Sequence, residues 1–162
     1  MFKKVSENIL DVLKTMEELE KMIEELYMTC SQIWSFDNGF WTHMELAERK
    51  HARNMNNKMI KMISEKPESF VLNPQFKSAA IKTAFAGIKW HIQRLKKNEI
   101  AREKMLYISR DIEQSLLEKN YNKVVRTNDA AFESLMNEIV SDTAAHHDQL
   151  NKKIEEGLKG PN

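Results

Sequence analysis

The segment from Trp41 to Met55 constrains the fold more than any other part of the chain, because it places polar side chains inside an apolar helical face. Glu48 and His51 stand three residues apart, a spacing that puts a carboxylate and an imidazole side by side on one face of a helix. Methionines continue that face at three- or four-residue steps, namely Met44, Met55, Met59 and Met62. A carboxylate that faces a core is costly unless it is paired, hydrogen-bonded or bound to a metal. The rest of the chain is therefore expected to bring partners to this point.

The composition is typical of one all-helical domain that covers residues 1–162, with only 4 Gly and 3 Pro. The 25 Lys and Arg nearly balance the 24 Asp and Glu, so we expect no nucleic-acid partner and no basic membrane patch. Cys30 is the single cysteine, which excludes an internal disulfide or a CxxC site and favours a cytoplasmic location. No window resembles a signal peptide or the roughly 20 apolar residues of a membrane span.

Hydrophobic periodicity predicts helices over about 6–34, 40–64, 75–97, 99–119 and 123–156. A short turn around Gly39 favours an antiparallel hairpin, and two prolines, Pro67 and Pro74, mark the longest break. The pattern leaves open whether 75–119 is one helix or two, and whether the last helix begins at Lys123 or Asp129. We predict an antiparallel four-helix bundle, built from two hairpins joined by a long crossover that carries an additional helix.

The four bundle helices each carry a polar side chain in or beside an apolar stripe. The stripe of the first helix consists of Ile9, Leu13, Met16, Glu20, Ile23, Tyr27, Cys30 and Trp34. The core line of the 99–119 helix is predicted to be Met105, Ile108, Ile112 and Leu116, with Glu113 beside it. The last helix gives Phe132, Met136, Ile139, Thr143, His146 and Leu150. A Glu-bearing helix is thus followed by a His-bearing helix, twice.

These polar groups have two interpretations. Glu occupies 18 of 162 positions, so one Glu three residues before one of the five His is expected by accident. In the first interpretation they are edge residues or core groups bonded to one another. In the second, carboxylates and imidazoles from all four helices meet in the core, as in carboxylate-bridged di-iron or di-manganese bundles.

The segments Glu20–Tyr27, Phe40–Trp41 and Glu45–Ala52 resemble the first hairpin of rubrerythrin-like proteins of the ferritin-like superfamily. That hairpin has a Glu seven residues before a Tyr, followed by a Glu-x-x-His motif. The resemblance implies Glu20, Glu48 and His51 as metal ligands. It is weaker in the second half, where segment 110–116 implies Glu113 and segment 142–146 implies His146. Tyr27 would lie near the metal in a redox role, although a plain core tyrosine fits equally well.

The resemblance implies two non-haem iron ions, or manganese, and a reaction with hydrogen peroxide or oxygen: peroxide reduction or ferrous iron oxidation. The family has a second Glu-x-x-His, but Thr143 stands here in place of its Glu. Asp142 either compensates as a ligand, or the second metal position is weakened or empty. The four Cys of a rubredoxin module are missing, so a separate electron-donor protein is expected, and the chain is expected to form a homodimer. The alternative is a bundle with a degenerate or single-metal site that acts as a non-catalytic scaffold.

The remaining candidates have simpler expectations. His43 and His91 are expected to be packed or surface histidines, and Cys30 a small core residue. His147 is expected to be exposed, and it would replace His146 only if the helix register were shifted. A third function, a helical adaptor, would need an exposed apolar face. The stripe that could supply one consists of Ile81, Phe85, Ile88, Ile92 and Leu95.

Overall fold

The computed structural model describes residues 2–76, 78–118 and 121–158, with side chains from residue 9 onward. The predicted all-α class is confirmed, because most of the described chain is helical. The helices are α1 (Phe2–Ile33), α2 (Asn38–Asn54), α3 (Ile60–Glu65), α4 (Ser78–Lys96), α5 (Arg102–Glu118) and α6 (Ala130–Leu158). Two short strands that the sequence pattern did not indicate, β1 (Val71–Leu72) and β2 (Val125–Arg126), pair antiparallel. Lys119, the predicted end of the fourth helix, lies outside the described residues.

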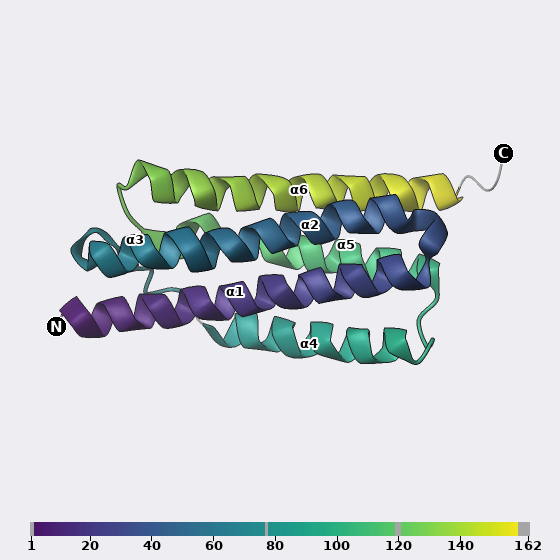
Figure 1. The fold of residues 1–162 in the computed structure, drawn as a ribbon, viewed down its shortest axis with the longest axis horizontal. Coiled ribbons are helices and arrows are strands. Elements are labelled where there is room, and N and C mark those ends of the chain that lie inside the picture. The colour runs from purple at the N-terminus through teal and green to yellow at the C-terminus, as the bar shows by residue number, and fades with distance from the viewer. Residues whose placement is uncertain (1, 77, 119–120, 159–162) are drawn as a thin grey trace.

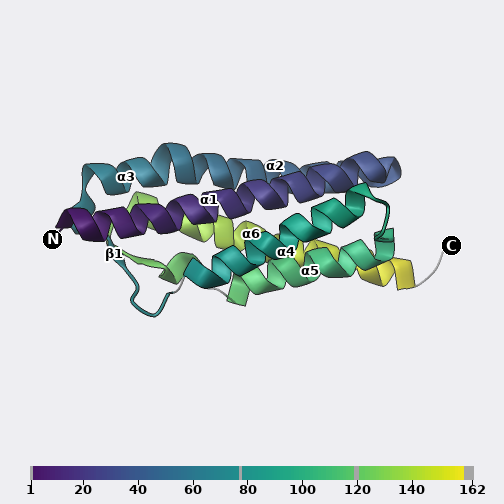
Figure 2. The same cartoon turned by 90° about the horizontal axis from the view of Figure 1, so that it is seen from below.

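The long helices lie along a common axis (Figures 1 and 2). In Figure 1, α1 and α6 run in one direction, and α2 with α3 and α5 run in the other. α4 returns the chain to the end where α2 begins, packed against α1 on the outside. α2 contacts α6, and Tyr27 of α1 bonds to Glu113 of α5, so the α1–α2 and α5–α6 hairpins face each other.

The stripes of α1, α4 and α6 form a large part of the apolar core. Along α1 and α6 the predicted stripe positions are buried, apart from Trp34, which is partly exposed. The stripe of α4 is buried as well, with Phe85 partly exposed, so it is not the free apolar surface that an adaptor would need. On α5 the predicted core line is confirmed at Met105 and Leu116, which are buried, and is wrong at its two middle positions. Ser109 and Glu113 are fully buried, whereas Ile108 and Ile112 are only partly buried and line a groove of about 280 Å³ against α4.

A π-helical turn over Met55–Met59 separates α2 from α3. Such a turn adds a residue to the regular helix and shifts the face that follows it. As a result Ile63 is fully buried, whereas Met62, which the sequence pattern placed in the stripe, is only partly buried. The turn begins four residues after His51.

The region 75–119 contains two helices. α4 ends in a left-handed turn at Asn98, where φ is 57°, and the Glu99 amide donates to the Arg94 carbonyl at 3.0 Å. This is an ordinary way to terminate a helix, and Asn is one of the few residues besides Gly that adopts it readily. The last helix begins after Asp129, whose carboxylate accepts a hydrogen bond from the Phe132 amide at 3.0 Å, and not at Lys123.

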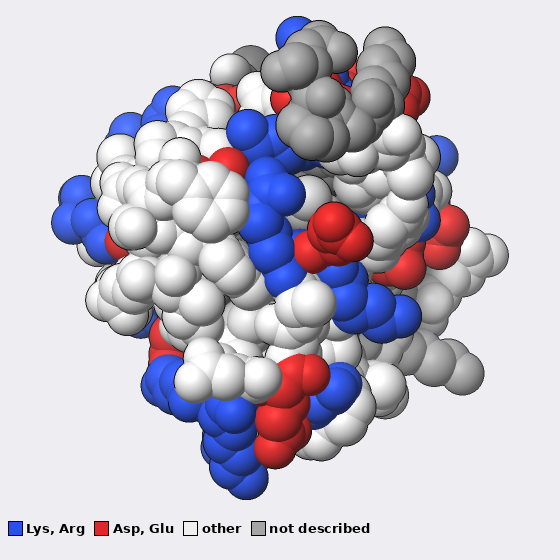
Figure 3. Space-filling view, turned by 90° about the vertical axis from the view of Figure 1, so that its right-hand side faces the viewer, with Lys and Arg blue, Asp and Glu red and all other residues white. Residues whose placement is uncertain are grey.

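Ion pairs connect the ends of neighbouring helices. Asp37, in the turn between α1 and α2, is buried and pairs with Arg102 at the start of α5 and with Lys153 of α6. On the end face drawn in Figure 3, basic and acidic side chains lie beside one another among large uncharged areas. Within the described residues, no helix is both long enough and apolar enough to cross a membrane.

Candidate metal centre

Five of the predicted ligand residues converge in the interior. Potential ligand atoms of Glu20, Glu48 and His51 lie within 4.8 Å of one another, and those of Glu48, Glu113 and His146 form a second such group. α1 supplies Glu20, α2 supplies Glu48 and His51, α5 supplies Glu113 and α6 supplies His146. All five residues are at most 2% exposed.

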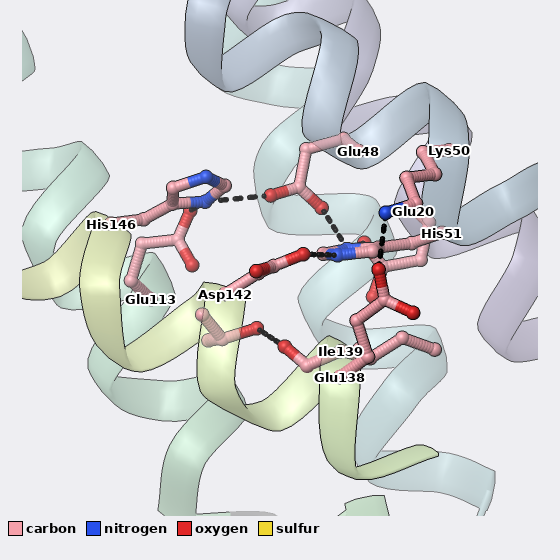
Figure 4. Close-up of polar contacts among 10 residues, drawn as sticks. Glu20, Glu48, Lys50, His51, Glu113, Glu138, Ile139, Asp142 and His146 are labelled. Carbon is pink, nitrogen blue, oxygen red and sulfur yellow. Dashed lines mark hydrogen bonds and ion pairs between the residues drawn. The ribbon is translucent and has the colours of Figure 1, made fainter. Parts of the chain in front are cut away.

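Glu48 belongs to both groups and lies between the two imidazoles (Figure 4). One of its oxygens, Oε1, lies 3.0 Å from His146 Nδ1, and the other, Oε2, lies 3.4 Å from His51 Nδ1. Glu20 Oε2 lies 3.7 Å from His51 Nδ1, and Glu113 Oε1 lies 3.5 Å from His146 Nδ1. Each end of the site therefore has one imidazole, one carboxylate of its own and one oxygen of the shared carboxylate.

Most of these polar atoms are buried without a hydrogen bond. They are both side-chain oxygens of Glu20 and of Glu48, Oε2 of Glu113, and Nδ1 of His51 and of His146. Buried polar groups in proteins are nearly always hydrogen-bonded, and each exception needs an explanation. A bound ion at the point where these atoms converge would provide one.

The charge states of the five side chains depend on one another. Burial raises the pKa of Glu20 well above its usual value, and the neighbouring Glu48 carboxylate raises it further. Burial raises the pKa of Glu113 too, with Glu48 adding to the effect. Burial would also raise the pKa of Glu48, but contacts with Glu20, His146 and His51 hold it below its usual value.

The pKa of each imidazole is raised, although burial alone would lower it. Burial would lower the pKa of His51, but the Glu20 and Glu48 carboxylates outweigh it and raise the pKa to about 11. Burial would likewise lower the pKa of His146, but Glu113 and Glu48 raise it to about 10. Without a metal, protons on the imidazoles therefore balance the carboxylates.

Asp142 belongs to neither group of potential ligands. Its Oδ2 lies 2.9 Å from Nε2 of His51, whereas Glu20 and Glu48 lie nearest the other ring nitrogen, Nδ1. Figure 4 draws the contact between Asp142 and His51. A carboxylate in this position fixes the orientation and tautomer of a metal-binding histidine. Asp142 therefore contacts the predicted ligand His51 and is not part of either ligand group, so the structure does not support Asp142 as a metal ligand.

Two buried tyrosines interact with carboxylates of the cluster. The hydroxyl of Tyr27 donates a hydrogen bond of 2.5 Å to Oε1 of Glu113, so Tyr27 does lie beside the predicted ligands. Tyr121, which lies between the predicted helices 99–119 and 123–156, is 2% exposed, and its hydroxyl is buried without a hydrogen-bond partner. Burial raises its pKa, and the Glu20, Glu48 and Glu113 carboxylates raise it further. A large aromatic residue in a polar turn was the one signal that could have identified Tyr121.

The other candidates lie outside the two groups. Thr143 is buried, but its hydroxyl donates to the Ile139 carbonyl at 2.8 Å. His147 is partly exposed and lies 3.7 Å from Asp148, so the helix register favours His146. His43 is exposed, although its ring meets that of His146 edge-on, with centroids 6.3 Å apart. Cys30 is fully buried.

A pocket of about 320 Å³ between α2 and α6 reaches one end of the cluster. Its lining includes His43, Lys50, Asp142, His146 and Gln149. His146 is the one member of the two ligand groups that lines it. The end of the site that contains His146 is therefore the end adjacent to this pocket.

Comparisons with known proteins add no family to this geometry, because no protein-family model, no curated protein and no solved structure matches the chain.

Proposed function

We propose that this protein binds two metal ions, iron in the first instance and manganese as the other candidate, with Glu48 as the carboxylate that bridges them. The observation that carries the proposal is the set of buried, unbonded oxygen and nitrogen atoms that converge from four helices. Carboxylates suit iron and manganese, and imidazole suits iron. Glu48 presents one oxygen to each end of the site, which is what a bridging ligand requires.

The proposal includes the fold. Two hairpins that face each other, joined by a crossover that carries α4, match the connectivity of ferritin-like bundles. Such bundles place carboxylates and Glu-x-x-His motifs inward from facing helices. The likeness of segments 20–27 and 45–52 to rubrerythrin-like proteins points to the same class.

The proposed reaction is peroxide reduction or ferrous iron oxidation by oxygen or peroxide. When bound, the two iron ions would supply the electrons for this chemistry. In a peroxidase cycle, a separate electron-donor protein would then return electrons to the oxidised iron. The residues of this chain hold and shield the centre. Asp142 orients His51, and Tyr27 holds a proton at the Glu113 carboxylate. Burial, with the Glu113 charge, raises the pKa of Tyr27 well above its usual value, so that proton stays in place near neutral pH.

Metal analysis tests the proposal directly. The protein is loaded with ferrous iron without oxygen, freed of excess metal, and its iron and protein contents are measured. We expect close to two iron ions per chain, and near-complete loss in a Glu48→Gln variant, because both ends lose their shared ligand. The matched control is Glu45→Gln, one turn earlier on α2, where the carboxylate bonds to Arg49 instead. Wild-type iron content in Glu48→Gln would refute the assignment.

Thr143 favours a second candidate, a scaffold of the same fold with a single-metal or degenerate site. Position 143 lies one turn before His146, as Glu48 lies before His51, yet it supplies a hydroxyl that bonds to the backbone. Peroxide consumption distinguishes the two functions. An iron-loaded sample that consumes peroxide no faster than the same amount of free iron would favour the scaffold.

A further inference from the structure

The two ends of the proposed centre are built differently, although they share Glu48. α2 supplies Glu48 and His51 three residues apart, whereas α6 supplies Thr143 and His146 at the same spacing. The Thr143 hydroxyl donates to the Ile139 carbonyl and is not aimed at the cluster. α6 therefore adds an imidazole to its end of the site and no carboxylate.

The contacts behind the two imidazoles differ as well. Nε2 of His51 is held at 2.9 Å by Asp142, which leaves Nδ1 to face Glu20 and Glu48. In the part of the chain that the structure describes, no carboxylate bonds to the outer nitrogen of His146, and this residue lines the pocket between α2 and α6. His51 does not line this pocket and is fully buried.

We propose that the two metal positions are inequivalent in affinity and in access. The Glu20–Glu48–His51 end binds the first ion and retains it. The Glu48–Glu113–His146 end binds the second ion more weakly, exchanges it through the α2–α6 pocket, and keeps an open coordination position there for a small ligand. This inference rests on the proposed function, because it assumes that the cluster binds metal.

The expected size of the difference follows from the outer contact of each imidazole, because the facing groups are equal in number at the two ends. Loss of an outer partner such as Asp142 typically weakens metal binding tenfold to a hundredfold. Among the described residues, the imidazole of the second end lacks such a partner. We therefore expect the second ion to bind at least about tenfold more weakly than the first.

Titration of the metal-free protein with Co²⁺ tests the inference, since cobalt absorbance reports each ion as it binds. We expect two steps, the second at least about tenfold weaker. Thr143→Glu should strengthen the second step at least tenfold and leave the first unchanged, with the near-isosteric Thr143→Val as the matched control. Asp142→Asn should weaken the first step about tenfold, and Glu138→Gln, one turn earlier on α6, should weaken neither.

Access is tested separately, which also covers the case in which Thr143→Glu does not fold. Ala145→Trp fills the pocket from its lining and leaves every proposed ligand in place in the sequence. Extraction of the second cobalt by EDTA should slow at least tenfold in this variant. Binding of azide to the cobalt-loaded protein, read from the absorbance change, should be lost in parallel.

The outcomes separate the two proposals. A wild-type protein that binds no cobalt contradicts the proposed function itself. Two ions of equal affinity, with extraction unaffected by Ala145→Trp, leave the function standing and overturn the inequivalence. Binding of a single ion, with a second gained in Thr143→Glu, supports the inference in its extreme form.

Discussion

Metal binding should release protons, and the number released measures how the side chains of the centre are charged before the metal binds. Metal ions bind neutral imidazoles and ionised carboxylates, so every proton held by the cluster must leave. With a pKa of about 11 for His51 and about 10 for His146, both imidazoles are protonated in nearly all molecules at pH 7. Loading of both ends should therefore release at least two protons per chain. Glu20 and Glu113, whose pKa values burial raises, would add any protons they retain.

Ordinary histidines would give a clearly different result. An unperturbed imidazole, with a pKa of about 6.5, is about one-quarter protonated at pH 7, so two of them would release roughly half a proton. Calorimetric titration with Co²⁺ in two buffers of different ionisation enthalpy counts the protons, and Glu48→Gln provides the background. Release of two protons also makes the combined affinity for both ions rise about a hundredfold per pH unit. Release of less than about one proton would refute the charge assignment.

Three further predictions concern stability, each measured by urea unfolding of the metal-free protein. Folding raises the pKa of both imidazoles, so their stabilising contribution is complete below about pH 6.5 and is lost toward pH 10–11. The free energy of unfolding should therefore fall above pH 7, by up to about 1.4 kcal/mol per pH unit per histidine, and a flat profile would contradict this. Tyr27→Phe should cost about 1.5–3 kcal/mol, because it removes a hydrogen bond to a buried carboxylate, whereas Tyr121→Phe should cost nothing, because that hydroxyl has no partner. An equal loss of unfolding free energy in the two variants would contradict this prediction. At the left-handed residue Asn98, substitution by Ala should cost about 1 kcal/mol and substitution by Gly should not, so equal stability of the two variants would rule out this reasoning.

The parts of the fold that sequence predicts best are helices with one apolar face. α1 and α6 each bury a single stripe, so a period of 3.6 identifies the side that faces the core, including Glu20 and His146. α5 is harder because its apolar surface is wide. Ile108 and Ile112 face the groove against α4, while Glu113 occupies the interior, and periodicity alone cannot decide which of two neighbouring faces is the more buried.

Backbone irregularities account for most of what the sequence could not predict. The π-helical turn at Met55–Met59 moves the buried face from Met62 to Ile63, and a calculation based on a regular helix cannot anticipate that shift. Tyr121 lies in a 3₁₀ turn, where side-chain direction does not follow from residue spacing, and the cluster carboxylates raise its pKa. The position of Asp142 behind His51 depends on how α6 packs against α2, which is a tertiary property.

A buried cluster of carboxylates and imidazoles is an energetically costly way to fill a core, and this cost is itself an argument for a bound ion. Seven side-chain atoms of Glu20, Glu48, His51, Glu113 and His146 are buried without a hydrogen bond, and an unsatisfied buried group costs about 1–3 kcal/mol. Apolar residues of similar volume would often give a fold at least as stable. A proton on an imidazole joins one nitrogen to a nearby carboxylate oxygen, so protons connect these atoms only in pairs. A cation at each end would contact an imidazole and two carboxylates at once, so one binding event would remove several of these penalties together.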